Sequence, residues 1–225
     1  MTDIVLIAGL WLPSEVWGEV QQHLEQLGHR SLAVEMPGQD DGDAGSDLSD
    51  QVSAVLATVD AADDPLVVGH SAAATLAWIA ADRRKLRGVA LIGGFPAADG
   101  DQYASFLPAI GGSIPFPGWE AFEGPDSADL SAEARKQLSA QLVPVPDGVA
   151  QGVVRLTDQN RYETPVTLIC PEFSPEDARA WIAGGDVPEL AKATKLSLVD
   201  IDSGHWPMIT RPEQLANLLA AAAAS

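Results

Sequence analysis

The run Leu66-Val67-Val68-Gly69-His70-Ser71-Ala72-Ala73-Ala74 is an apolar stretch that ends at a serine with small residues on both sides. It predicts a buried strand that turns sharply into a helix over 72–81. Such a turn holds the serine in a strained backbone conformation and presents its hydroxyl above the positive end of the helix. The pattern is nearly Gly-x-Ser-x-Gly, with Ala73 at the second glycine position. We therefore predict that Ser71 is a nucleophile, and the alternative is a serine that only caps a helix.

A second motif lies far downstream, in Val199-Asp200-Ile201-Asp202-Ser203-Gly204-His205-Trp206. It predicts a strand followed by a loop that turns an imidazole back over the sheet, and we expect the loop to need the conformational freedom of Gly204. A serine at one strand end and a histidine at a later one is an order that acyl transfer uses. His205 is therefore the predicted general base, and a buried structural histidine is the alternative. We expect His70 to pack beside Ser71 without reacting.

Around these motifs, short apolar runs alternate with amphipathic segments, which is typical of a mostly parallel sheet covered by helices. The predicted strands are 4–8, 30–34, 65–68, 88–92, 165–170 and 196–201, and the predicted helices are 14–27, 47–59, 72–83, 175–182 and 211–224. We expect a single α/β domain over residues 1–225.

The alternation stops over residues 95–163, where prolines and glycines are crowded and aromatic residues recur. A long irregular insertion inside a compact domain usually has a function. We therefore predict a lid or cap over the C-terminal edge of the sheet, with short helices near 103–107 and 131–141. The insertion carries no motif that identifies a substrate.

A turn at Gly9-Leu10-Trp11 follows the first predicted strand. In a parallel sheet, this turn and the serine turn lie at the same C-terminal edge, where ligands bind. The backbone N–H groups of Leu10 and Ala72 are the predicted donors to a developing oxyanion. A plain tight turn at Gly9 is the alternative. Trp11 and Trp206 adjoin the two presumed catalytic turns and are the predicted lining of a substrate pocket.

The composition indicates which kinds of partner the protein binds and in which cellular compartment we expect it. The net charge of −19 repels phosphate backbones and anionic membranes, so we expect no nucleic-acid or membrane partner. It also weakly favours neutral or cationic small-molecule substrates over anionic ones. Cys170 is the single cysteine, and no basic segment precedes the apolar run at Ile4, so we expect a cytoplasmic protein without a signal peptide. The scattered histidines give no metal-ligand spacing, and we predict no metal site.

Four segments together resemble the α/β-hydrolase superfamily: Gly69-His70-Ser71-Ala72-Ala73, Gly9-Leu10-Trp11, Pro37-Gly38-Gln39 and Gly204-His205-Trp206-Pro207. The resemblance is greatest to the branch of plant methylesterases and hydroxynitrile lyases and their bacterial esterase-like relatives. It implies an α/β-hydrolase fold, the serine as nucleophile, the histidine as base, and a reaction without a cofactor. The usual early His-Gly pair of this branch is Ala8-Gly9 here.

The resemblance also implies a triad acid, and here the sequence departs from the family pattern. Family members place an aspartate three or four residues after the strand that ends at Cys170, where this chain has Phe173-Ser174. Glu172 is the first carboxylate after that strand and is the predicted acid, because its extra methylene can compensate for its earlier position. Asp99 or Asp101, after the strand over 88–92, is the alternative source. A chain without a proper acid is the third possibility.

These inferences predict a serine hydrolase that acts on a small neutral ester or related acyl compound through an acyl-enzyme. Two other functions stay open. One is carbon–carbon or cyanohydrin cleavage on the same fold, because a fold does not fix a reaction. The other is ligand binding by a non-catalytic homologue that has lost the acid. A carboxylate partner for His205 Nδ1 would favour an enzyme.

Overall fold

The computed structural model describes residues 2–104 and 106–224. A six-stranded sheet runs through it in the order β2-β1-β3-β4-β7-β8, with every neighbouring pair parallel. Its strands are β1 (Asp3–Ile7), β2 (Arg30–Ala33), β3 (Leu66–His70), β4 (Gly88–Ile92), β7 (Val166–Cys170) and β8 (Leu196–Asp200). The predicted parallel α/β architecture is confirmed, and each predicted strand is present with its ends displaced by at most two residues.

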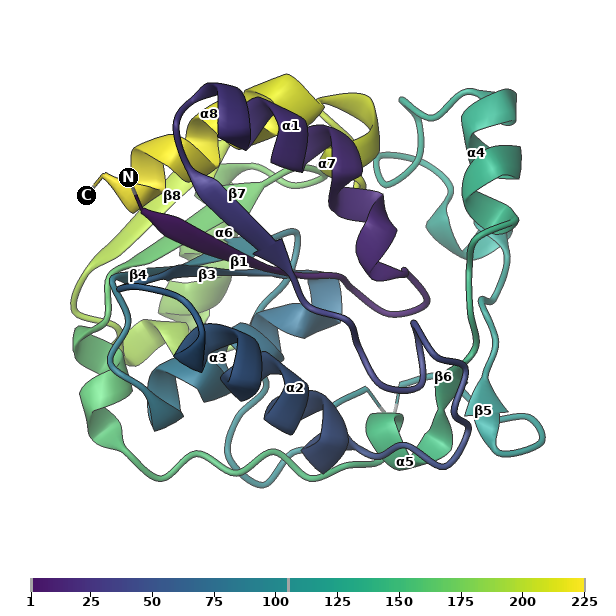
Figure 1. Ribbon diagram of the computed structural model, residues 1–225, viewed down its shortest axis with the longest axis horizontal. Coiled ribbons are helices and arrows are strands. Elements are labelled where there is room, and N and C mark those ends of the chain that lie inside the picture. The colour runs from purple at the N-terminus through teal and green to yellow at the C-terminus, as the bar shows by residue number, and fades with distance from the viewer. Residues whose placement is uncertain (1, 105, 225) are drawn as a thin grey trace.

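Helices cover both faces of this sheet, as Figure 1 shows. On one face α1 (Gly18–Gln26) packs against α8 (Pro212–Ala223), and on the other α2 (Leu48–Asp60) packs against α3 (Ala74–Arg83). Because both faces are covered, every residue of β1, β3 and β4 is buried, which explains why these strands are almost continuously apolar. None of the helices in residues 2–104 and 106–224 combines the length and apolarity needed to cross a bilayer.

The turn between β7 and α6 (Pro175–Gly184) is fixed by a helix cap. Ser174 accepts a hydrogen bond from the N–H of Asp177, and the Asp177 side chain accepts one from the N–H of Ser174, which is a capping box. Pro175 occupies the first helical turn, where its missing N–H is not needed. The strand end and this cap leave only residues 171–173 between them, so the position of Glu172 is narrowly defined.

Residues 113–150 of the insertion lie beyond the sheet end toward which β1 points, and residues 151–163 run back past α2 and α3 toward the opposite end (Figure 1). The elements of the insertion are β5 (Ser113–Ile114), η3 (Trp119–Phe122), α4 (Ala132–Ser139), β6 (Val145–Pro146), α5 (Asp147–Ala150) and η4 (Gln159–Glu163). The helix predicted near 131–141 is present as α4, which Ser131 caps.

The helix predicted near 103–107 is wrong for the described residues of that segment, which form bends and turns; Ser105 lies outside the described residues. The N–H groups of Tyr103 and Ala104 donate instead to the carbonyls of Gly152 and Ala150. These long-range bonds replace the local ones that a helix would need.

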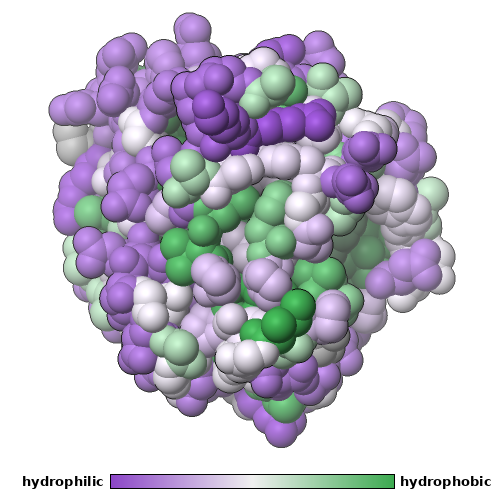
Figure 2. Space-filling view, turned by 90° about the vertical axis from the view of Figure 1, so that its right-hand side faces the viewer, coloured by the Kyte–Doolittle hydropathy of each residue, from purple (hydrophilic) through white to green (hydrophobic). Residues whose placement is uncertain are grey.

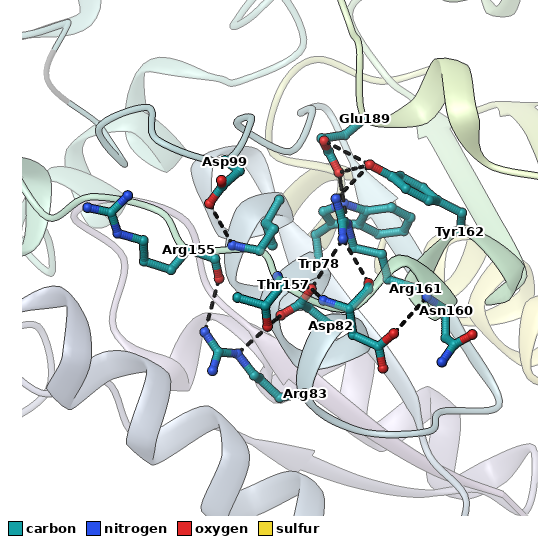
Figure 3. Close-up of polar contacts among 12 residues, drawn as sticks. Trp78, Asp82, Arg83, Asp99, Arg155, Thr157, Asn160, Arg161, Tyr162 and Glu189 are labelled. Carbon is teal, nitrogen blue, oxygen red and sulfur yellow. Dashed lines mark hydrogen bonds and ion pairs between the residues drawn. The ribbon is translucent and has the colours of Figure 1, made fainter.

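A buried ion network ties the end of the insertion to the core (Figure 3). Arg161 in η4 donates to Asp82 at 3.3 Å and to Glu189 at 2.9 Å. Glu189 also accepts a hydrogen bond from Trp78 Nε1 at 2.9 Å. Asp82 lies in the last turn of α3, which runs back from the serine turn, so this network sits at the end of α3 opposite Ser71.

Candidate active site

Ser71 follows β3 directly and begins the 3₁₀ turn η2 (Ser71–Ala73) that leads into α3. Its φ is +55°, a left-handed conformation that costs a non-glycine residue about 1–3 kcal/mol and that clusters at functional sites. A Cβ at Gly69 would overlap the backbone of Ala73, and one at Gly94 would overlap the backbone of Ser71 itself. Ala73 has a φ of −65°, which any residue adopts, so the alanine in the second glycine position is tolerated.

The His205 ring contacts a carboxylate. His205 Nδ1–H donates to Glu172 Oε1 at 2.7 Å, and the two side chains are only 13% and 14% exposed. Gly93 makes room for this pair, because a Cβ there would lie 3.2 Å from both His205 Nδ1 and Glu172 Oε2. With Nδ1 donating to Glu172, Nε2 is left as the acceptor that a general base needs.

The two alternative triad acids lie in the insertion and bind backbone groups there. Asp99 accepts a hydrogen bond from the N–H of Leu156 at 2.9 Å, and Asp101 accepts one from the N–H of Ala98 at 3.1 Å. The structure therefore brings Glu172, and neither of these aspartates, to His205. Ser71 Oγ has no hydrogen-bond partner among residues 2–104 and 106–224. Catalytic hydrogen bonds of this kind often tighten only once substrate is bound.

His70, which precedes the nucleophile candidate, reaches the histidine loop. Its Nε2–H donates to the backbone carbonyl of His205 at 2.7 Å, so the prediction that it only packs beside Ser71 missed this contact. Burial, and then the nearby His205, lower the pKa of His70 to about 3. It is therefore a neutral donor near pH 7. The sequence signal for this contact was the position of a histidine directly before the serine of the turn.

Two aspartates of the insertion also contact the histidine loop, and sequence reasoning missed both. The N–H of His205 donates to the backbone carbonyl of Asp126 at 2.7 Å, and the N–H of Gly204 donates to Asp129 Oδ2 at 2.9 Å. Burial, and then the charge of Glu172, raise the pKa of the Asp126 carboxyl. Gly204 is not in a left-handed conformation. It is required because a Cβ would overlap Asp126 O and Asp129 Oδ1, and the expected reason, conformational freedom, was wrong.

The predicted oxyanion turn is shaped by a buried glutamine. Gln39 Nε2 donates to the carbonyls of Gly9 and Leu12, each at 3.0 Å. Trp11 within this turn has a φ of +67°, so strain is present here as well as at the serine. The N–H groups of Leu10 and Ala72 have no acceptor within the described parts of the chain. Both predicted oxyanion donors are therefore unpaired within the described residues.

Aromatic side chains of the insertion surround the two predicted pocket residues. Trp11 Nε1 donates to the carbonyl of Ile114, and the Trp11 ring meets the edges of Phe116 and Phe122. The Trp206 ring lies 5.2 Å from that of Phe122, which is itself stacked 6.3 Å from the His205 imidazole. On this end of the molecule, hydrophobic residues gather near the centre of the face and hydrophilic ones surround them (Figure 2). The walls beside His205 are therefore apolar and aromatic.

Within residues 2–104 and 106–224, no group of three or more histidine, cysteine, aspartate or glutamate side chains is arranged to hold a metal ion.

The chain is similar to known proteins in its sequence profile and in its fold. The sequence profile of the alpha/beta hydrolase family matches residues 4–218. Among proteins of curated function, no sequence matches the chain significantly. An extracellular alpha/beta-hydrolase from a Paenibacillus species, described as sharing structural and functional homology with tobacco salicylic acid binding protein 2, superposes with a TM-score of 0.80 at 18% identity over 99% of both chains.

Two further solved structures share the fold. A methylesterase from Arabidopsis has a TM-score of 0.77 at 15% identity, covering 100% of this chain and 99% of its own. A pyrethroid hydrolase from Sphingobium faniae has a TM-score of 0.74 at 20% identity, covering 100% of this chain and 98% of its own. Likeness at these identities establishes a common fold over essentially the whole chain.

Proposed function

The chain belongs to the alpha/beta hydrolase family, and from that premise we propose that it is a serine hydrolase of a small, neutral, fairly apolar ester or related acyl compound. The observation that carries the proposal is the contact of 2.7 Å between His205 Nδ1 and Glu172 Oε1, together with a serine held at a φ of +55° directly after β3. A carboxylate in this position fixes the imidazole tautomer and stabilises the imidazolium.

The proposed reaction proceeds in two steps. His205 Nε2 takes the Ser71 proton while Oγ attacks the carbonyl carbon, and the N–H groups of Leu10 and Ala72 stabilise the oxyanion. The C–O bond to the leaving group then breaks, and the imidazolium gives its proton to the departing alcohol, which leaves an acyl-enzyme. A water that His205 deprotonates then attacks the acyl carbon, and the carboxylic acid is released as Ser71 regains its proton.

The surroundings of the site support this substrate class. The rings of Trp11, Phe122 and Trp206 present apolar surface beside His205, which suits a fairly apolar acyl or alkyl group. Glu172 and the neighbouring Asp126 make the site acidic, which favours a neutral ester over an anionic one. Of the structural neighbours, one is described as a methylesterase and another as a pyrethroid hydrolase.

Labelling with a fluorophosphonate tests the nucleophile directly. We expect one adduct per chain, located on Ser71 by peptide mass spectrometry, and no adduct on Ser71→Ala. The same variant should lose activity toward an activated ester on the order of 10⁶-fold in kcat, as removal of the nucleophile does in serine proteases. Retention of more than a few per cent of the parent activity would exclude Ser71 as the nucleophile.

The same assay separates the two other functions. An enzyme that cleaves cyanohydrins or carbon–carbon bonds would turn over such a compound faster than any ester of matched size. A non-catalytic homologue would bind an ester without turning it over and would not react with the fluorophosphonate.

A further inference from the structure

Residues 119–130 of the insertion, which we call the cap segment, lie against residues 203–206, which we call the histidine loop. The Trp119 ring lies 5.2 Å from that of Trp206, and the Phe122 ring stacks 6.3 Å from that of His205. Two hydrogen bonds join the same parts of the chain. The N–H of His205 donates to Asp126 O, and the N–H of Gly204 donates to Asp129 Oδ2.

These contacts leave no space between the two segments. A Cβ at Gly204 would overlap both Asp126 O and Asp129 Oδ1. Gly204 is buried, and Asp129 Oδ1 is itself inaccessible to solvent. The histidine loop therefore cannot approach the cap segment further, and it cannot withdraw without leaving buried polar groups unpaired, which is costly.

The cap segment is braced from its other side by α4. Arg135 donates to the carbonyl of Ser127 at 2.6 Å and lies 5.6 Å from the Trp119 ring centroid. Ser127 Oγ in turn donates to the carbonyl of Phe122 at 2.6 Å. The cap segment is thus tied internally and to a helix, which gives the histidine loop a fixed surface to rest on.

Groups from three parts of the chain hold His205 and its loop, and each contacts a different atom. Glu172 holds the ring at Nδ1, and His70 donates to the backbone carbonyl. The Asp126 carbonyl accepts from the backbone N–H, while the Asp126 carboxyl and Glu172 contribute negative charge nearby. Asp129 alone among these groups acts from the cap segment through its side chain, on the residue before His205.

We propose that Asp129 is a positioning residue, which holds the histidine loop so that His205 Nδ1 stays on Glu172 and Nε2 stays available to Ser71. The inference rests on the proposed hydrolase function. It also makes the cap segment a fixed part of the active site, whereas a lid would open. Without the Asp129 carboxylate, the buried Gly204 N–H loses its acceptor and the loop can shift.

The test compares Asp129→Ala with Asp129→Asn, whose amide oxygen can still accept from Gly204 N–H. We expect the alanine variant to lose about tenfold to hundredfold in kcat, because a shift of about 1 Å at the reacting groups has such an effect. KM should stay within about twofold, since Asp129 is not proposed to touch substrate. Asp129→Asn should recover most of kcat.

Asp99→Ala is the matched control. It removes another aspartate of the insertion that accepts a backbone N–H, that of Leu156, without a contact to the histidine loop. We expect its kcat to equal that of the parent. Parent-like kcat in Asp129→Ala, or an equal loss in Asp99→Ala, would overturn the proposal.

A double-mutant cycle with Glu172→Ala, which removes the acceptor, shows whether Asp129 acts through the His205–Glu172 contact. Once that contact is lost, Asp129→Ala should reduce kcat by much less than it does in the parent, because groups that act as a unit are not additive. A full, independent loss in the Glu172→Ala background would contradict the positioning role.

An NMR measurement tests the proposal even if the parent hydrolyses no ester. The His205 Nδ1 proton, shared with Glu172, should give a downfield resonance in the parent, in Asp99→Ala and in Asp129→Asn. The resonance should broaden or disappear in Asp129→Ala. Its persistence there would overturn the positioning role, whereas absence of ester hydrolysis together with the expected NMR result would reject only the proposed function.

Discussion

Both backbone polar groups of His205 are used to hold it in place. The N–H donates to the Asp126 carbonyl and the carbonyl accepts from His70 Nε2, each at 2.7 Å, so the residue is held from two sides before its ring makes any contact. The ring is then oriented by Glu172. In the proposed reaction, a base held in this way needs little reorganisation when it accepts a proton, which is the condition for efficient general-base catalysis.

The neutral state of His70 predicts how stability depends on pH. The folded protein keeps His70 neutral down to a pKa of about 3, whereas the unfolded chain takes up a proton near the ordinary pKa of 6.5. The stabilisation is therefore complete above about pH 6.5 and declines below it, by up to about 1.4 kcal/mol of unfolding free energy per pH unit. Urea unfolding between about pH 5 and about pH 7.5 measures this slope.

His70→Gln is the comparison, because its amide can still donate to the His205 carbonyl but does not titrate. The difference in unfolding free energy between parent and variant should shrink as pH falls through this range, since only the parent loses stability by protonation of the unfolded chain. A difference that does not change with pH would show that His70 has the same pKa in the folded and the unfolded protein.

At the scale of elements, the sheet and its helices could be predicted because their signals are local. Val67 and Val68 belong to an apolar strand that is followed directly by its turn. The start of α6 is marked by the capping box between Ser174 and Asp177, which are three residues apart. Within the insertion only α4 could be predicted, because the rest of its backbone is held by distant partners. The N–H of Val143 donates to the carbonyl of Trp11, and that of Tyr103 to Gly152.

The candidate site likewise contains residues that local motifs indicate and residues that they do not. Ser71 and His205 stand in short motifs that can be read locally. Glu172 was predicted only as the first carboxylate after the strand that ends at Cys170, with an acid after the strand over 88–92, or no acid, as alternatives. Asp126 and Asp129 lie more than 70 residues before the loop they contact, in a segment without a motif. Nothing in their own neighbourhood in the sequence indicates a partner.

The buried network in Figure 3 predicts a strong dependence of stability on Arg161. Hydrogen bonds from Arg161 and Trp78 outweigh the effect of burial and hold the pKa of Glu189 below its ordinary value. In Arg161→Met, the carboxylates of Asp82 and Glu189, whose side chains are 0% and 3% exposed, lose their buried cation. They keep only Arg83 and Lys192, whose side chains are 39% and 57% exposed. Loss of one partner from a buried ion pair costs about 3–5 kcal/mol.

Arg84→Met is the matched control, because Arg84 pairs with Asp60 on the surface and both side chains are largely exposed. Its urea midpoint should stay close to that of the parent, since exposed ion pairs contribute little. A comparable midpoint shift in the two variants would mean that the buried network contributes no more to stability than a surface pair.

At the scale of the whole molecule, charge is unevenly distributed. Four of the 13 basic residues, Arg83, Arg84, Lys85 and Arg87, cluster between α3 and β4, at the end of α3 opposite Ser71. Around His205 the structure places the carboxyl groups of Glu172 and Asp126. With a net charge of −19, the end of the molecule that carries His205 therefore presents a negative field to an approaching ligand.

This field predicts different salt responses for esters that differ only in charge. Between about 0.02 M and about 0.5 M NaCl the Debye length shortens several-fold, so the field is largely screened at the higher concentration. We expect kcat/KM to rise on the order of threefold to tenfold for an anionic activated ester, to fall for its cationic counterpart and to stay level for the neutral one. A shared response of all three esters would instead indicate an effect of salt on the protein, because only electrostatic attraction or repulsion changes sign with the charge of the substrate.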